Sequence, residues 1–126
     1  MFRATFKPLV LYRTSTRCQS TVKQLTSFKD FETAISNKKL SLIDFYATWC
    51  GPCKAISPHI ANLSQEFKDI NFYKVDVDEN PDIARHCRIT AMPTFVFFQS
   101  GDNLGKVVGA DPKGIKEGLI RFAKSN

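Results

Sequence analysis

The sequence predicts an α/β protein whose mixed central β-sheet is flanked by helices on both faces. Short apolar runs alternate with amphipathic helical patterns along the chain, which favours parallel strands joined by helical crossovers. The last two strand-like runs are separated by a tight turn instead of a helix, which adds an antiparallel hairpin. The predicted order of elements is therefore βαβαβαββα.

The first two elements are a weak edge strand over residues 22–25 and a helix that follows it. Thr26 and Ser27 can cap this helix, because their side chains accept hydrogen bonds from the free N–H groups of the first turn. We expect the helix to end near Asn37. Its apolar face comprises Phe28, Phe31 and Ile35.

The next two elements are a buried strand over residues 40–47 and a long helix. The strand is rich in apolar and aromatic residues and is bounded by polar ones. Pro58 removes one backbone hydrogen bond and should kink the helix without ending it, because the apolar stripe continues beyond it. That stripe comprises Cys53, Ile56, Ile60, Leu63 and Phe67.

A third strand over residues 70–77 leads into a short helix. Asn80 is expected to cap this helix, and Pro81 supplies the proline that is favoured in a first turn. The helix runs through Ile83, Ala84 and Cys87.

The chain ends with the hairpin and a last helix. The hairpin strands cover residues 94–99 and 104–108, with the turn at residues 100–102. Asp111 caps the last helix and Pro112 starts it. Gly114 and Gly118 weaken the helix by about 1 kcal/mol each relative to alanine. Its inner face comprises Ile115, Leu119 and Phe122.

Length and composition indicate one domain without a membrane span. The chain has 126 residues, and its 43% hydrophobic content with 11 phenylalanines is ample for a single core. No apolar run approaches the roughly 18 residues of a membrane-spanning helix, so we expect no membrane partner.

The net charge of +6 is concentrated at the N-terminus. Its first bases are Arg3, Lys7, Arg13 and Arg17, and the first acid is Asp30. Without these four bases, 14 basic residues face 12 acidic ones, a net charge of +2. The basic character therefore belongs to the tail, and we expect no nucleic-acid partner.

Residues 1–20 have the composition of a mitochondrial transit peptide. They contain no acid, four bases and several hydroxyl residues, and they lack the apolar core of a secretory signal. A basic unstructured tail is the alternative interpretation. We expect cleavage near residues 17–20, which leaves a single domain over residues 21–126.

Two cysteines three positions apart, Cys50 and Cys53, predict redox chemistry. Cys50 falls at the exposed start of the long helix, where free N–H groups and the positive dipole end favour a thiolate. Cys53 lies on the buried stripe. Disulfide exchange needs one thiolate to attack and a second thiol to release the mixed disulfide, and this spacing provides both. The alternatives are a zinc half-site and two idle thiols, but zinc normally takes four ligands, often as two such pairs.

Asp44 is an acid inside the predicted buried strand, six positions before Cys50. Burial disfavours its ionisation, so its pKa should rise. A raised acid near a thiol is a fit candidate for a general base, whereas a hydrogen-bonded polar residue of the core is the alternative.

These residues together resemble the thioredoxin family over about residues 22–124. The resemblance rests on Trp-Cys-Gly-Pro-Cys-Lys at residues 49–54 and on Met-Pro-Thr at residues 92–94. Other residues found where the family has them are Asp44, Pro58, Lys74 and Gly109. The resemblance implies the thioredoxin fold, and the chain looks most like the fungal-type mitochondrial members.

The resemblance also implies roles for individual residues. Cys50 would attack, Cys53 would resolve, and Asp44 would handle the proton of Cys53 with Lys74 as its partner. The Met92–Pro93 peptide bond would be cis and would present its backbone to a substrate strand. The residues implied in substrate binding are Trp49, Gly51, Pro52, Met92 and Pro93.

The activity that the resemblance implies is protein-disulfide reduction by a monomer that binds no cofactor and no metal. Electrons would come from NADPH through thioredoxin reductase. They would pass to oxidised proteins such as peroxiredoxins and methionine sulfoxide reductases in the mitochondrial matrix. The alternatives are an oxidising or isomerising relative, and a thioredoxin-fold binding subunit that does not use its thiols.

Overall fold

The computed structural model describes residues 21–124, so the predicted transit peptide lies outside the described residues. The order of elements is the predicted βαβαβαββα. The elements are β1 (Val22–Gln24), α1 (Phe28–Ile35), β2 (Ser41–Tyr46), α2 (Gly51–Glu66), β3 (Asn71–Asp76), α3 (Pro81–His86), β4 (Thr94–Gln99), β5 (Asp102–Val108) and α4 (Pro112–Lys124). None of the helices in this part of the chain is long and apolar enough to cross a membrane.

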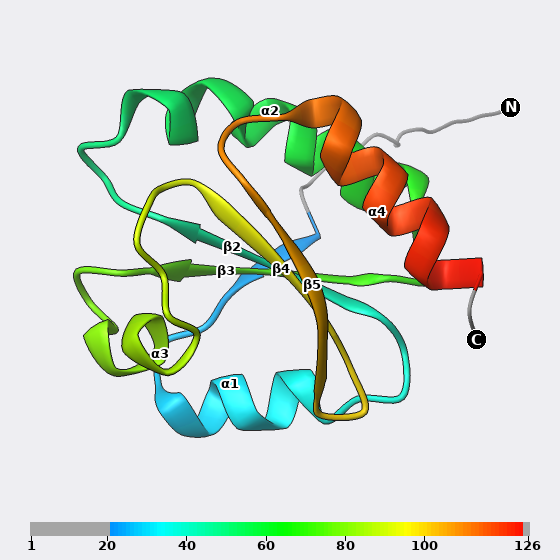
Figure 1. Cartoon of the computed structure of the whole chain (residues 1–126), viewed down its shortest axis with the longest axis horizontal. Coiled ribbons are helices and arrows are strands. Elements are labelled where there is room, and N and C mark those ends of the chain that lie inside the picture. Colours follow the sequence, from blue (N-terminus) through cyan, green and yellow to red (C-terminus); the bar gives the residue numbers. More distant parts are fainter. Residues whose placement is uncertain (1–20, 125–126) are drawn as a thin grey trace, which may run out of the picture.

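The five strands form one mixed sheet in the order β1-β3-β2-β4-β5. β1, β3 and β2 run parallel, whereas β4 pairs antiparallel with both β2 and β5. Helices cover both faces, with α2 and α4 on one side and α1 and α3 on the other (Figure 1). The predicted mixed sheet is therefore confirmed, and β2 is its central strand.

Alternation along the strands divides the core into two apolar clusters. On the α2 and α4 side, Leu42 and Phe95 pack with helix residues such as Ile60 and Leu119. On the α1 and α3 side, the next strand residue, Ile43, packs with Phe31 and Ile83. Because successive side chains of a strand point to opposite faces, Asp44 lies on the same face as Leu42, beneath α2.

The hairpin differs from the prediction, because β5 begins at Asp102 and not at Leu104. Ser100 and Gly101 have φ values of 51° and 85°, so these two residues make the whole turn and Asp102 already pairs with Gln99. A positive φ at both central residues defines the tight turn that matches strand twist. The pairing of β4 with β5 changes register between Phe97 and Phe98, and this shift accommodates a β5 that is longer than predicted.

Two of the three predicted helix caps are present. Ser27 accepts a hydrogen bond from the N–H of Asp30, and Asp111 accepts one from the N–H of Gly114, both at 3.1 Å. Asn80 occupies the predicted cap position of α3, but its side chain makes no cap hydrogen bond and donates instead to the carbonyl of Asp76. α2 continues past Pro58 as predicted.

Gly118 has a packing role that its low helix propensity does not reveal. A Cβ atom at this position would lie 2.5 Å from Cζ of Phe97 on β4. The absence of a side chain therefore lets α4 approach the sheet closely, which outweighs the cost of a glycine inside a helix.

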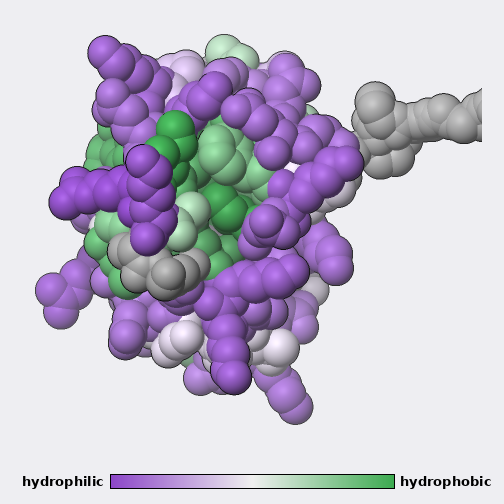
Figure 2. All heavy atoms as spheres, turned by 90° about the vertical axis from the view of Figure 1, so that its right-hand side faces the viewer, coloured by the Kyte–Doolittle hydropathy of each residue, from purple (hydrophilic) through white to green (hydrophobic). Residues whose placement is uncertain are grey.

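The end of the sheet where β2 and β3 begin carries none of the predicted site residues. Figure 2 shows this end, where hydrophilic side chains surround an apolar area. A shallow depression of about 580 Å³ lies here, lined among others by Leu40, Ile70 and Lys39. The predicted site lies at the opposite end of the same strands.

Candidate active site at the start of helix α2

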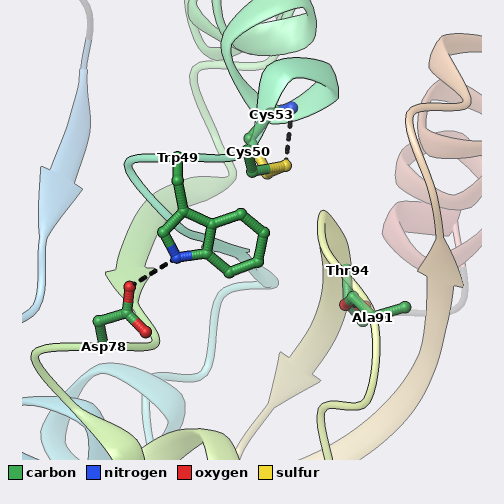
Figure 3. Close-up of a disulfide and its surroundings, with 6 residues drawn as sticks. All are labelled: Trp49, Cys50, Cys53, Asp78, Ala91 and Thr94. Carbon is green, nitrogen blue, oxygen red and sulfur yellow. Dashed lines mark hydrogen bonds between the residues drawn. A yellow bond between two sulfur atoms is a disulfide. The ribbon is translucent and has the colours of Figure 1, made fainter.

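The two thiols lie at the start of α2, just after the central strand of the sheet ends. β2 ends at Tyr46, α2 begins at Gly51, and Cys50 and Cys53 are joined by a disulfide (Figure 3). The carboxyl end of a central strand followed by a helix N-terminus is a common position for active sites in α/β proteins.

Cys50 is the N-cap residue of α2. Its backbone is extended, with φ of −86° and ψ of 110°, and its Sγ accepts a hydrogen bond of 3.2 Å from the N–H of Cys53. Pro52 occupies the first turn, where its missing N–H costs nothing. The N–H groups and the positive dipole end of α2 therefore point at the sulfur of Cys50, which favours a thiolate there once the disulfide is reduced.

Exposure does not separate the two cysteines in this oxidised state. We expected Cys50 to be exposed and Cys53 buried, but each is only 5% exposed. Both sulfurs belong to a small cluster with Ala47, and the half-buried side chain of Met92 packs against it. Met92 is distant in sequence, and its contact covers Cys50, which its position at the helix start alone would leave exposed to solvent.

Trp49 forms a fixed, exposed surface beside the disulfide. Its side chain is 67% exposed, yet its Nε1–H donates a hydrogen bond of 2.9 Å to Oδ2 of Asp78 (Figure 3). Asp78 was not among the predicted site residues. Local pattern could not identify it, because the two residues are 29 positions apart.

The loop before β4 faces the disulfide from the other side (Figure 3). The Met92–Pro93 peptide bond is cis in the structure, as the resemblance implied. Thr94 Oγ1 donates to the carbonyl of Ala91 at 2.6 Å, and the N–H of Gly109 donates to the carbonyl of Pro93 at 2.8 Å. These two bonds tie the loop to the sheet beside Cys50.

Asp44 is buried beneath α2, with 8% of its surface exposed. Its Oδ1 has no hydrogen-bond partner within the described residues. Burial raises the pKa of Asp44 to about 7, and the charge of Lys74 partly opposes that rise. The predicted rise is confirmed, and a carboxyl group that titrates near neutral pH can both take up and give off a proton.

A cleft of about 340 Å³ brings the predicted proton-handling residues together. Asp44, Cys53 and Lys74 all line it. Asp44 and Lys74 are register partners on the adjacent strands β2 and β3, so both side chains emerge on the same face of the sheet. The lining is mostly apolar, but the cleft is large enough to hold water, and Asp44 and Lys74 offer polar partners to it.

Lys74 and Asp44 are neighbours but do not form an ion pair; in the described part of the chain the ion-pair contact is Lys116 with Glu66. The ammonium of Lys74 instead lies 5.8 Å from the centre of the Tyr46 ring. Tyr46 was not among the predicted site residues, although its position two residues after Asp44 on the same strand face could have indicated it.

Residues 21–124 contain no group of three or more His, Cys, Asp or Glu side chains that could hold a metal ion. Cys87 is a free thiol in the other apolar cluster, and burial raises its pKa to about 11.

Comparison with known proteins agrees with this geometry. The family model for thioredoxin matches residues 21–124. Mitochondrial thioredoxin-3 of Saccharomyces cerevisiae is 44% identical over 119 residues, which cover 94% of this chain and 93% of that protein. The crystal structure of its oxidised form superposes with a TM-score of 0.78 at 44% identity, covering 83% of this chain and 99% of that one.

A second solved structure concerns the thiol-resolving mechanism of a yeast mitochondrial 1-Cys peroxiredoxin through the glutathione and thioredoxin systems. Its matching chain is 44% identical, with a TM-score of 0.77, and covers 80% of this chain and 95% of that one.

A dithiol that closes into a disulfide at a helix N-terminus, beside a buried acid, defines a thiol–disulfide oxidoreductase. The chain belongs to the thioredoxin family. It is a protein-disulfide reductase of the thioredoxin fold.

Proposed function

We propose that this reductase works in mitochondria, with Cys50 as the attacking thiol, Cys53 as the resolving thiol and Asp44 as the proton acceptor for Cys53. The observation that carries the proposal is the Cys50–Cys53 disulfide at the start of α2, with Asp44 and Cys53 lining one cleft.

The first step is attack on the substrate. The thiolate of Cys50 attacks one sulfur of the substrate disulfide, forming a mixed disulfide and releasing the other substrate sulfur as a thiolate. Its attack is favoured because the N–H of Cys53 points at the sulfur of Cys50. Cys53 lies inside the first turn and is the donor of that hydrogen bond, so its sulfur is not at the cap position.

The second step closes the disulfide. Cys53 gives its proton to the carboxylate of Asp44, directly or through water in the cleft, and its thiolate attacks the sulfur of Cys50. The bond between Cys50 and the substrate breaks, and the second substrate sulfur leaves as a thiolate that takes a proton from solvent. The protein then carries the Cys50–Cys53 disulfide, and two electrons have passed to the substrate.

The surface around Cys50 suits an extended substrate segment. Trp49 is exposed and held in place, and Gly51 and Pro52 add exposed small surfaces at the tip of α2. On the other side, the half-buried Met92 packs against the disulfide cluster, and its cis peptide bond leads into the buried Pro93. These five residues form the proposed docking surface.

Electrons are proposed to come from NADPH through thioredoxin reductase, with no cofactor bound to this chain. Oxidised peroxiredoxins and methionine sulfoxide reductases are the proposed acceptors, and this chain is proposed to act on them as a monomer. Support comes from the matching chain in the study of a yeast mitochondrial 1-Cys peroxiredoxin.

A mitochondrial matrix location is proposed on two grounds. The acid-free, basic N-terminus has transit-peptide composition, and a mitochondrial yeast thioredoxin is similar along nearly the whole chain. Residues 1–20 are the proposed transit peptide and residues 21–126 the thioredoxin domain. N-terminal sequencing of the organellar protein should begin at residues 18–21; an intact Met1 would contradict the proposal.

Reduction of insulin in the presence of NADPH and thioredoxin reductase tests the function. Wild-type protein should couple NADPH oxidation to insulin reduction, whereas the Cys50→Ser, Cys53→Ser variant should not. If the double variant retained the cellular function of the protein, the chain would act as a thioredoxin-fold binding subunit instead.

A further inference from the structure

We propose that Tyr46, tied to Gln24, is a positioning residue that holds the ammonium of Lys74 beside Asp44. The inference deepens the proposed role of Asp44 as proton acceptor and rests on it. It assigns a function to a contact between three strands that the disulfide chemistry alone does not require.

Three side chains form a row across the sheet. Gln24 of β1 is the register partner of Lys74 of β3, and Lys74 is in turn the register partner of Asp44 of β2. Register partners on parallel strands emerge on the same face, so the lysine stands between the amide and the acid. The three strands lie side by side at one edge of the sheet (Figure 1).

The side chain of Tyr46 lies across this row and is bonded to Gln24 at its far end; we call the Tyr46–Gln24 pair the strap. Tyr46 lies two residues after Asp44 on β2, on the same face, and its hydroxyl donates a hydrogen bond of 3.0 Å to Oε1 of Gln24 on the far side of Lys74. The Lys74 ammonium lies 5.8 Å from the ring centre, within range of a cation–π contact. The phenol is protonated near neutral pH and can donate this bond, since the ordinary pKa of tyrosine is 10.0 and burial raises the pKa of Tyr46 further.

The strap holds the Lys74 ammonium near Asp44 without a direct ion pair. Lys74 is close enough to favour the carboxylate of Asp44, yet it forms no ion pair with it. A free lysine side chain has several rotatable bonds and would spend much of its time in bulk water. Confinement by the Tyr46 ring therefore keeps a stabilising charge at the mouth of the cleft.

Other charged groups around the cleft must be separated from this effect. α2 contributes Cys53 and Lys54 to the lining, and β3 contributes Lys74. β4 presents the apolar Phe95 as the other register partner of Asp44. The acids that act on Tyr46 besides Asp44 are Asp76 and Glu79. Lys54 is the other lysine of the lining, so the test must show that the effect passes through Lys74.

The test measures the pKa of Asp44 by the pH dependence of its carboxyl ¹³C resonance in the oxidised protein. Tyr46→Phe keeps the ring and the burial but removes the bond to Gln24. The pKa should rise by about 0.5, because a ring released from Gln24 no longer confines the Lys74 ammonium, and the energy of an exposed cation–π contact sets the upper limit of that loss. Gln24→Leu, which cuts the strap at its other end, should give the same rise.

Two controls make the result specific. Tyr73→Phe removes a hydroxyl from β3 on the opposite face of the sheet and should leave the pKa of Asp44 unchanged. In a Lys74→Met background, Tyr46→Phe should no longer change it, because the charge that the strap positions is gone.

Three results would overturn the inference: no shift in Tyr46→Phe, a fall in the pKa, or a rise that persists in the Lys74→Met background. The resonance is measured without turnover, so this outcome is independent of catalysis. A normal resolution rate in Asp44→Asn would instead refute the proton-acceptor role while leaving the coupling between Tyr46, Lys74 and Asp44 intact.

Discussion

Asp44 is a single residue whose burial links stability to pH. In the unfolded chain its carboxyl group ionises near the ordinary pKa of 3.8, whereas in the folded protein the pKa is about 7. Between these values the folded state retains a proton that the unfolded state has lost. The free energy of unfolding must therefore fall as pH rises through this window, by a total on the order of 4 kcal/mol.

Asp44→Asn should remove this dependence. We expect the variant and the wild type to have similar free energies of unfolding at pH 4, and the variant to be more stable at pH 8 by up to about 4 kcal/mol. Urea denaturation of both oxidised proteins at pH 4, 6 and 8 measures the difference. A difference that stays constant with pH would mean that Asp44 titrates normally in the folded protein.

The same variant tests the proton transfer. Asp44→Asn should leave the attack by Cys50 nearly unchanged and should slow the release of the mixed disulfide near neutral pH. General-base effects are about 10²–10⁴-fold, and smaller where water can substitute. Rapid acid quenching followed by mass spectrometry follows both steps. Unchanged release, in a variant of lower stability, would make Asp44 a polar anchor of the core.

The three described cysteines should differ in reactivity after reduction. Cys50 should be alkylated first by limiting iodoacetamide, because the N–H of Cys53 and the end of α2 stabilise its thiolate. Cys87 should react slowly at pH 7, since burial raises its pKa to about 11. Peptide mapping gives the order; equal labelling of Cys50 and Cys53 would contradict the assignment of their roles.

At the scale of elements, α4 can approach β4 only because residue 118 is glycine. Gly118→Ala places a methyl group against the Phe97 ring, and overpacking of this kind costs about 1–3 kcal/mol. The better helix propensity of alanine returns about 1 kcal/mol, so we expect a net loss of stability.

Gly114→Ala is the matched control within α4. Its added methyl group would meet the carboxylate of Asp111, which can move aside at the cost of the cap bond to the N–H of residue 114, about 1 kcal/mol, and the helix propensity of alanine offsets that cost. Thermal unfolding of both variants measures the difference, and Phe97→Leu should partly rescue Gly118→Ala. Greater stability of Gly118→Ala than wild type would show that the helix shifts without cost.

Signals that lie within a few residues of one another predicted most of the fold. The order of elements, the caps at Ser27 and Asp111 and the passage of α2 through Pro58 all follow from such local patterns. The strand ends were less well defined. β5 starts earlier than predicted because Ser100 adopts a positive φ, which its residue type does not favour.

Contacts between distant segments were the part of the site that sequence could not supply. The thiol pair and Asp44 were predicted correctly in position, because each is marked by its own strand or helix pattern. The burial of Cys50 depends on Met92, and the orientation of Trp49 depends on Asp78. Such partners become neighbours only once the sheet has formed.

At the scale of the whole molecule, the site is built from both sides of the chain's midpoint. β2 and α2 supply Asp44 and the thiols, β3 supplies Lys74, and the loop before β4 supplies the cis-proline. The two apolar clusters pack a pair of helices on each face of the sheet and so fix the positions of these parts relative to one another. This arrangement brings the two sulfurs and the acid together at one end of the sheet.

The central claim, that Cys50 attacks and Cys53 resolves, is tested most directly by trapping the mixed disulfide. Reduced Cys53→Ser protein mixed with oxidised insulin should give a covalent adduct in the intact mass spectrum, joined through Cys50 in the peptide map, because the resolving thiol is absent. Cys50→Ser should give little or no such adduct. An adduct through Cys53 in Cys50→Ser as abundant as the one through Cys50, or no adduct in either variant, would contradict the account.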